Sequence, residues 1–113
     1  MTPAFKTALD SFMASAQAMI DRYMAEHFAL QAKKLAIDPG GKRYLRIVER
    51  SGLKVNGELP EGASRSCWAF IDLESGDVLK PDGWKRPAKH ARGNIFNPNP
   101  VEGVSPYGPH YMR

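Results

Sequence analysis

The longest stretch of this chain without glycine or proline runs from Ala4 to Asp38, and Pro39-Gly40-Gly41 ends it. Apolar side chains recur along its first part at steps of three and four residues, the repeat of one helical face. They are Phe5, Leu9, Phe12, Ala16, Met19 and Tyr23. Thr2 and Pro3 suit the N-cap and first turn of such a helix. The sequence therefore predicts a helical segment over residues 1–38.

An unbroken helix over this segment would be about 45–50 Å long at 1.5 Å per residue, which is long for so small a domain. Either it breaks near Glu26–His27, where the periodicity slips, to give a helical hairpin, or part of it packs on another subunit. Strands of about seven residues span only ~23 Å. Half of the helix would then overhang the strands, which predicts an exposed apolar stripe and a homodimer through this helix. The stripe would include Phe5, Leu9, Phe12 and Met19.

Alternating apolar and polar residues after Gly41 are typical of strands. We expect strands over 42–50, 65–73 and 78–80, a long loop over 51–64 and a tight turn at Glu74–Asp77. Residues 94–113 are rich in proline and glycine and read as an irregular tail. Apolar anchors would hold this tail on the domain: Ile95, Phe96, Val101, Val104, Tyr107 and Tyr111. The expected fold is α+β, a single domain over 1–113 (helical segment 1–38, meander 43–80, basic loop and tail 81–113), with the helix on one face of a three-stranded antiparallel sheet.

Strand alternation divides residues 65–73 between two faces. Cys67, Ala69, Ile71 and Leu73 would pack under the helix, and Ser66, Trp68, Phe70 and Asp72 would lie opposite. Two interpretations of the opposite face are open. In the first, its aromatic rings stack on single-stranded bases, and cations among them, such as Arg46, hold the phosphates. In the second, the tail folds over the rings and makes them part of a second core.

The net charge of +4 is uneven, because residues 77–113 hold six cations and three acids. Cations gather between Gly76 and Asn97, where glycine and proline favour a loop with one helical turn near 84–91. This pattern predicts a nucleic-acid-binding surface. Its candidate residues are Lys80, Trp84, Lys85, Arg86, Lys89 and Arg92, with Trp68 and Arg46 from the strands. The alternative is structural: Trp84 would plug the core, and Arg92 would pair with an internal carboxylate such as Asp72.

No catalytic signature is present in the sequence. Cys67 is the single cysteine and lies in an apolar run, which indicates a buried, inert thiol rather than a nucleophile or half of a disulfide. The three histidines lack metal-ligand spacing, and no phosphate-cradling glycine loop or nucleophile elbow occurs. Asp72 and Asp77 flank the predicted turn, but a cation site needs a third ligand. We expect no cofactor, no metal, no membrane span and a cytoplasmic location.

Three segments carry a resemblance to a known group of proteins: Trp68-Ala69-Phe70-Ile71-Asp72, Gly76-Asp77-Val78-Leu79-Lys80 and the run from Trp84 to Ile95. With Arg43–Val48 upstream and Ser105–Arg113 at the end, they resemble small uncharacterised proteins of tailed bacteriophages, often found in marine viral and metagenome sequence. The resemblance covers residues 43–113. It implies a viral source, hence an infected host cell, and assigns no activity to any residue.

Two functional hypotheses follow from these patterns. The first is a non-enzymatic protein that binds nucleic acid, single strands above all, or assists replication. The alternative is a virion structural or assembly protein that acts through protein–protein contacts. An enzyme ranks behind both.

Overall fold

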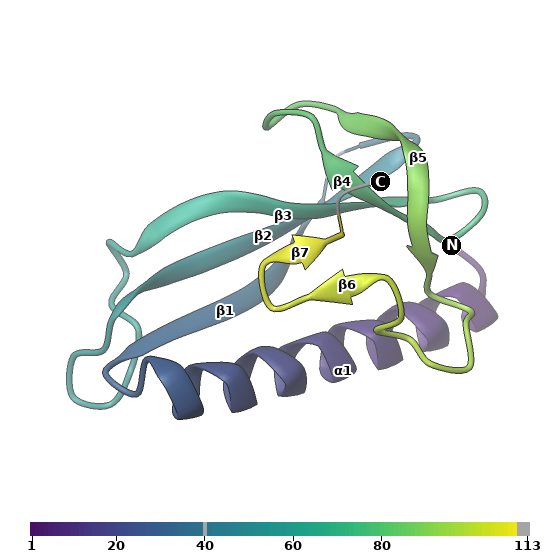
Figure 1. Cartoon of the computed structure of the whole chain (residues 1–113). Coiled ribbons are helices and arrows are strands. Elements are labelled where there is room, and N and C mark those ends of the chain that lie inside the picture. Colours follow the sequence, from purple (N-terminus) through teal and green to yellow (C-terminus); the bar gives the residue numbers. More distant parts are fainter. Residues whose placement is uncertain (40, 111–113) are drawn as a thin grey trace.

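The computed structural model describes residues 1–39 and 41–110, which form one helix and seven strands. The elements are α1 (Pro3–His27), β1 (Gln31–Asp38), β2 (Tyr44–Leu53), β3 (Ser64–Asp72), β4 (Asp77–Pro81), β5 (Pro87–Asn94), β6 (Val104–Ser105) and β7 (Gly108–Pro109). Strands β1 to β5 form one antiparallel sheet in sequence order, and β6 and β7 form a separate hairpin (Figure 1). The α+β class is confirmed, but the sheet has five strands where three were expected.

Helix α1 begins as its sequence predicts and ends much earlier than its composition suggests. The Phe5 amide donates to Thr2 Oγ1 at 3.1 Å, so Thr2 is the N-cap. The helix ends at His27, near the break that was one of the two alternatives, but a strand follows it, so both the helical segment over 1–38 and the helical hairpin are wrong. Residues 31–38 are not helical but pair with β2 along their whole length, from Gln31 opposite Leu53 to Asp38 opposite Arg46. Eight ladder pairs outweigh the helix propensity of the Ala, Lys, Leu and Gln residues in this segment.

The free edge of β1 is closed by a side chain of α1. Gln17 accepts from the Leu35 amide at 2.8 Å and donates to the Lys33 carbonyl at 2.9 Å. One glutamine side chain thus takes the place of a neighbouring strand at the centre of β1. This contact satisfies two backbone groups at the free edge of β1, which could otherwise pair with a strand of another chain.

The apolar stripe of α1 packs on the inner face of the sheet. Phe5, Leu9 and Phe12 are buried and Met19 is partly buried, so the expected exposed stripe is wrong. Strand β2 has ten residues and spans about 33 Å, close to the ~37 Å of the 25-residue helix, so little of the helix overhangs. Because the stripe is buried within one chain, it no longer supports a homodimer through this helix.

A β-bulge decides which face carries Trp68. The register between β2 and β3 shifts from Ile47 opposite Ala69 to Val48 opposite Cys67, which leaves Trp68 as the extra residue. Trp68 therefore joins Ala69 on the inner face, where it is 2% exposed and its ring centre lies 6.2 Å from that of Phe12. The expected faces for Cys67 and Trp68 are thus exchanged, because strict alternation fails at a bulge.

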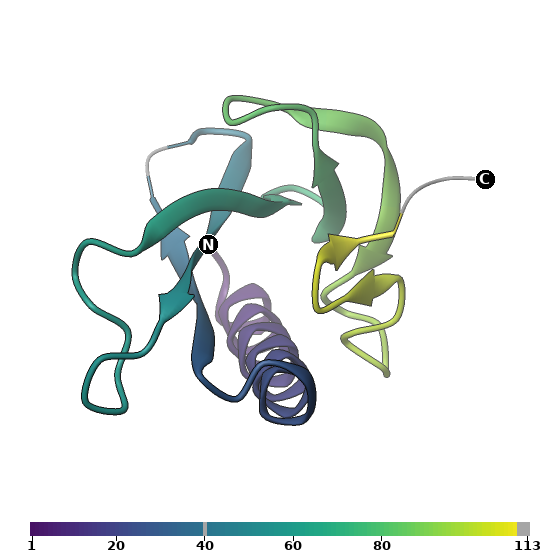
Figure 2. The ribbon, with the colours of Figure 1, turned by 60° about the vertical axis from the view of Figure 1, so that its left-hand side comes forward.

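The tail after β5 crosses the opening between the sheet and α1. Figure 2, which views the helix nearly end-on, shows the sheet curving around it and the β6–β7 hairpin on the side of β5. The Trp68 indole N–H donates to the Pro106 carbonyl at 3.3 Å, and the hydroxyls of Tyr23 and Tyr107 lie 2.5 Å apart. Val104 is buried, whereas Phe96 and Tyr107 are 52% and 63% exposed. The expected anchor Tyr111 lies outside the described residues.

Along the chain as described, with its gaps at residue 40 and after 110, no helix is long and apolar enough to cross a membrane.

Candidate functional site

The outer face of the sheet, opposite α1, carries a guanidinium group near its centre. Arg46 Nη1 donates to Asp38 Oδ2 at 2.8 Å, and Arg46 Nε donates to the Trp84 carbonyl at 2.9 Å. The guanidinium carbon lies 4.6 Å from the centre of the Trp84 ring and 5.7 Å from that of the Phe70 ring. These contacts draw the connection between β4 and β5 over the outer face. Arg46 therefore positions Trp84 there.

Trp84 lies on the surface and not in the core. Its side chain is 40% exposed, and a second cation, Arg65 of β3, lies 5.6 Å from its ring centre. The alternative in which Trp84 plugs the core is therefore wrong. Phe70 does remain on the outer face, as strand alternation predicts, but it is only 2% exposed. Trp84 is thus far more exposed to solvent on this face than Phe70.

Two hollows lie between the sheet and the β4–β5 hairpin, with volumes of about 180 and 430 Å³. Arg43 and Tyr44 line both, so the hollows adjoin across these two side chains. Lys42 and Lys85 line the smaller hollow, and Arg86 and Lys89 line the larger one. Within residues 1–39 and 41–110, Lys42, Lys85 and Lys89 form no ion pair, and Arg86 lies 3.8 Å from Asp82 with both side chains largely exposed. This outer cleft, defined as the two hollows together, is therefore bordered by four accessible cations.

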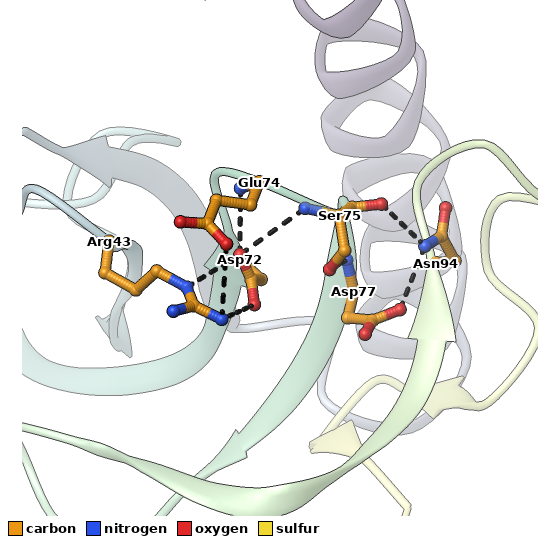
Figure 3. Close-up of polar contacts among 6 residues, drawn as sticks. All are labelled: Arg43, Asp72, Glu74, Ser75, Asp77 and Asn94. Atoms are coloured by element: carbon orange, nitrogen blue, oxygen red, sulfur yellow. Dashed lines mark hydrogen bonds and ion pairs between the residues drawn. The ribbon is translucent and has the colours of Figure 1, made fainter.

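A buried carboxylate fixes the turn beside the larger hollow. Asp72 accepts two hydrogen bonds from Arg43, at 3.2 and 3.1 Å, and further ones from the amides of Glu74 and Ser75 (Figure 3). The hydrogen bonds from Arg43, with those from the turn amides, hold the pKa of Asp72 below its usual value against the opposing effect of burial. The same contact raises the pKa of Arg43. The alternative in which Arg92 pairs with Asp72 is therefore wrong.

Asp77, the other carboxylate that flanks this turn, also has a hydrogen-bond partner within the protein. The side-chain amide of Asn94 donates to Asp77 Oδ1 and to the Ser75 carbonyl, both at 3.0 Å. It thereby ties β5 to the β3–β4 turn (Figure 3). Over the described part of the chain, no group of three His, Cys, Asp or Glu side chains gathers around a possible metal position.

Four of the residues proposed for nucleic-acid binding do not border the outer cleft. Trp68 lies in the core. Lys80 donates to the Pro109 carbonyl at 3.2 Å, and Arg92 donates to the carbonyls of His110 and His90. Lys80 and Arg92 therefore hold the tail. Trp84 packs on Arg46, which lines the smaller hollow, but the Trp84 side chain itself lines neither hollow. The structure brings Lys85, Arg86 and Lys89 together around the cleft.

Residues 87–94, expected as part of a loop with a helical turn, form the edge strand β5. Because its side chains alternate, Lys89 lines the outer cleft whereas Arg92 reaches the tail. The single expected basic surface is thereby divided between two sides of the sheet.

Cys67 carries no sign of reactivity. Burial raises the pKa of its thiol to about 11, because the charged form would lose hydration. The thiolate that a nucleophile requires is therefore almost absent near neutral pH. This agrees with the inert thiol expected from the sequence.

Sequence reasoning missed three cations of this face: Lys42, Arg43 and Arg65. The first two precede Tyr44 directly, so a basic pair followed by an aromatic residue at a strand start was an available signal. Arg65 had none, since only the folded sheet brings it to Trp84.

Comparison with known proteins returned no match among curated proteins and none among solved structures. A family model, described as a family of unknown function, matches residues 5–105, which include nearly all of α1, the whole five-stranded sheet and β6. The chain therefore belongs to this family of unknown function, DUF7717.

Proposed function

We propose that the protein binds single-stranded nucleic acid, without catalysis, along the outer cleft. The observation that carries this proposal is the combination of an exposed tryptophan ring, beside the cleft, with three lysines that form no ion pair within residues 1–39 and 41–110. Trp84 is 40% exposed, and Lys42, Lys85 and Lys89 approach the same hollows from separate elements. Surfaces that bind single strands combine aromatic side chains, which stack on bases, with cations, which neutralise phosphates.

Each group has a defined part in this proposal. Lys85, Arg86 and Lys89 contact phosphates, because they are exposed and have the most freedom to reach a ligand. Trp84 stacks on a base, held in place by Arg46. Arg43 and Tyr44 separate the two hollows, so successive nucleotides would lie on either side of them.

The biological setting proposed here follows from the sequence resemblance to tailed-bacteriophage proteins. In that setting the protein would assist replication in the cytoplasm of an infected host cell. A virion assembly role through protein–protein contacts is the second candidate, favoured by the large apolar side chains of Leu30 and Leu53, which are 79% and 64% exposed.

Fluorescence anisotropy with a labelled single-stranded oligonucleotide, measured over a range of salt concentrations, tests the proposal. Each phosphate neutralised on a single strand contributes a slope of about −0.7 to log affinity against log salt. Three to four engaged cations therefore predict a slope of about −2 to −3. Absence of binding to single- and double-stranded oligonucleotides at low salt would refute the proposal and leave the assembly role.

A matched pair of triple variants separates the cleft from overall charge. Replacing Lys85, Arg86 and Lys89 with alanine should bring the slope close to zero. The control replaces Lys6, Arg22 and Lys54, three exposed cations away from the cleft, and loses the same charge. Equal weakening by both triple variants would show that only net charge matters.

Trp84→Ala tests stacking directly. Base stacking on an aromatic side chain contributes about 1–3 kcal/mol per base, so affinity should fall roughly 5- to 150-fold with little change in the salt slope. An unchanged affinity would remove Trp84 from the site.

A further inference from the structure

Three cations lie directly opposite one another across β1, β2 and β3, which run side by side (Figure 1). The pairing of β1 with β2 puts Lys34 opposite Arg50, and the pairing of β2 with β3 puts Arg50 opposite Arg65. Residues that are paired across antiparallel strands have their side chains on the same face of the sheet. We call these three residues the cation row.

The cation row lies on the outer face, away from α1. Arg50 follows Arg46 by four residues on β2, so strand alternation puts both side chains on one face. Arg46 binds the Trp84 carbonyl on the outer face, and the Arg65 guanidinium carbon lies 5.6 Å from the Trp84 ring centre. The bulge at Trp68 explains the position of Arg65, because strict alternation along β3 would turn this side chain to the inner face.

Little negative charge balances the cation row. Lys34 lies 3.4 Å from Asp21, with both side chains about half exposed. Within residues 1–39 and 41–110, Arg50 and Arg65 form no ion pair, and Arg50 donates instead to two backbone carbonyls of the loop after β2. Like charges directly opposite one another destabilise a sheet. An anion that binds across the cation row would therefore relieve this repulsion.

Trp84 lies between the cation row and the outer cleft. The guanidinium carbon of Arg46, which lines the smaller hollow, lies 4.6 Å from the Trp84 ring centre, and Arg65 of the cation row approaches the same ring. A base that stacks on this ring has one phosphate on each side of it along the strand. One phosphate then faces Lys85, which also lines the smaller hollow, and the other faces Arg65.

We propose that the cation row is a second phosphate-binding subsite, on the other side of Trp84 from the outer cleft. This inference rests on the proposed function and extends its site from a cleft to a track across the sheet. Tyr44 in the cleft and Arg50 in the cation row are six residues apart on β2, so the track is about 20 Å long. A single strand therefore gains affinity when it is long enough to reach the cation row.

Two carboxylates limit the track beyond the cation row. Lys34 and Arg50 also line a hollow of about 550 Å³ that lies next to the loop after β2. Asp21 and Glu58 line the same hollow and would repel a phosphate there. The bound strand therefore leaves the protein at the cation row.

Fluorescence anisotropy with single-stranded oligonucleotides of about 4 and about 12 nucleotides, over a range of salt concentrations, tests the inference. The shorter oligonucleotide occupies only the outer cleft and should give the slope of about −2 to −3 expected for the cleft. The longer one should steepen this slope by about 2, because three further cations contribute about 0.7 each. The variant Lys34→Gln/Arg65→Gln should remove about 1.4 of the added slope and should leave the shorter oligonucleotide unaffected.

Lys6 and Arg22, both on α1, provide a matched control. Lys6 pairs with an exposed aspartate at 3.3 Å, as Lys34 does, and Arg22 is exposed, as Arg65 is. Lys6→Gln/Arg22→Gln therefore loses the same charge on the other side of the sheet and should change the slope little. Lys34→Arg/Arg65→Lys keeps both charges and should retain the wild-type slope. Arg50 stays unchanged in every variant because it holds the loop after β2.

The results separate this inference from the proposed function. If the longer oligonucleotide gives the slope of the shorter one, or if the variant of Lys34 and Arg65 behaves as the control does, the cation row binds no phosphate although the cleft still binds a single strand. Equal weakening of both oligonucleotides by this variant would exclude a separate subsite. A wild-type protein that binds neither oligonucleotide would refute the proposed function and the inference together.

Discussion

Replacement of Trp68 distinguishes a core residue from a surface stacking residue. Because Trp68 is 2% exposed and packs near Phe12, Trp68→Ala should cost about 3–5 kcal/mol, as usual for a large aromatic deleted from a core. Domains of this size have about 5–15 kcal/mol of stability in total, so this variant should be close to unfolding. Trp68→Phe should cost about 2 kcal/mol, of which about 1 is the hydrogen bond to the Pro106 carbonyl.

Urea unfolding followed by circular dichroism measures these differences, and Trp84 is the matched control. Trp84→Ala should cost about 1 kcal/mol, the size of its contacts with Arg46 and Arg65. In the Trp84→Phe protein the remaining tryptophan should resist quenching by acrylamide until the protein unfolds. In the Trp68→Phe protein the remaining tryptophan should be quenched at once.

Equal stability losses for Trp68→Ala and Trp84→Ala would refute this reasoning. So would a Trp68 that acrylamide quenches in the folded state. Either result would place Trp68 on the outer face, as strict alternation predicts, and would mean that the β-bulge is absent in solution.

Three further predictions concern the edge strand, the buried carboxylate and the tail. Gln17→Ala should cost about 1–2 kcal/mol and should speed hydrogen exchange at the centre of β1, because both edge hydrogen bonds are lost. Asp72 has a lowered pKa when folded, so its stabilising effect is complete above its unfolded pKa of about 3.9 and is lost as the pH falls through the lower folded pKa. The stability advantage of wild type over Asp72→Asn should therefore shrink as the pH falls below about 4, and a constant difference would contradict this reasoning. Gly103→Ala would place a Cβ 1.8 Å from the Arg92 carbonyl oxygen at a φ of +86°, so the melting temperature should fall by several degrees, whereas Gly62→Ala, with open space around it, should change it little.

Prediction from the sequence succeeded where one local pattern decides the outcome. The N-cap at Thr2, the inert Cys67 and the β3–β4 turn each depend on a few neighbouring residues. The outer cleft was anticipated in part, because Trp84, Lys85 and Lys89 lie within six residues of one another. Arg65 and Asp38 reach the same face from distant strands, and only the pairing of those strands makes them neighbours.

The sequence by itself determined the α+β class, the apolar face of α1, the three central strands and an excess of positive charge near the hairpin. Those features follow from periodicity and composition, which are local. Tertiary structure alone decided that residues 31–38 form a strand and that residues 87–94 form another, because ladder pairing with β2 and β4 outweighs the local preference of the first segment for helix and of the second for a loop. It also decided the face of Trp68, since a single extra residue in the pairing of β2 and β3 turns a side chain from the surface into the core.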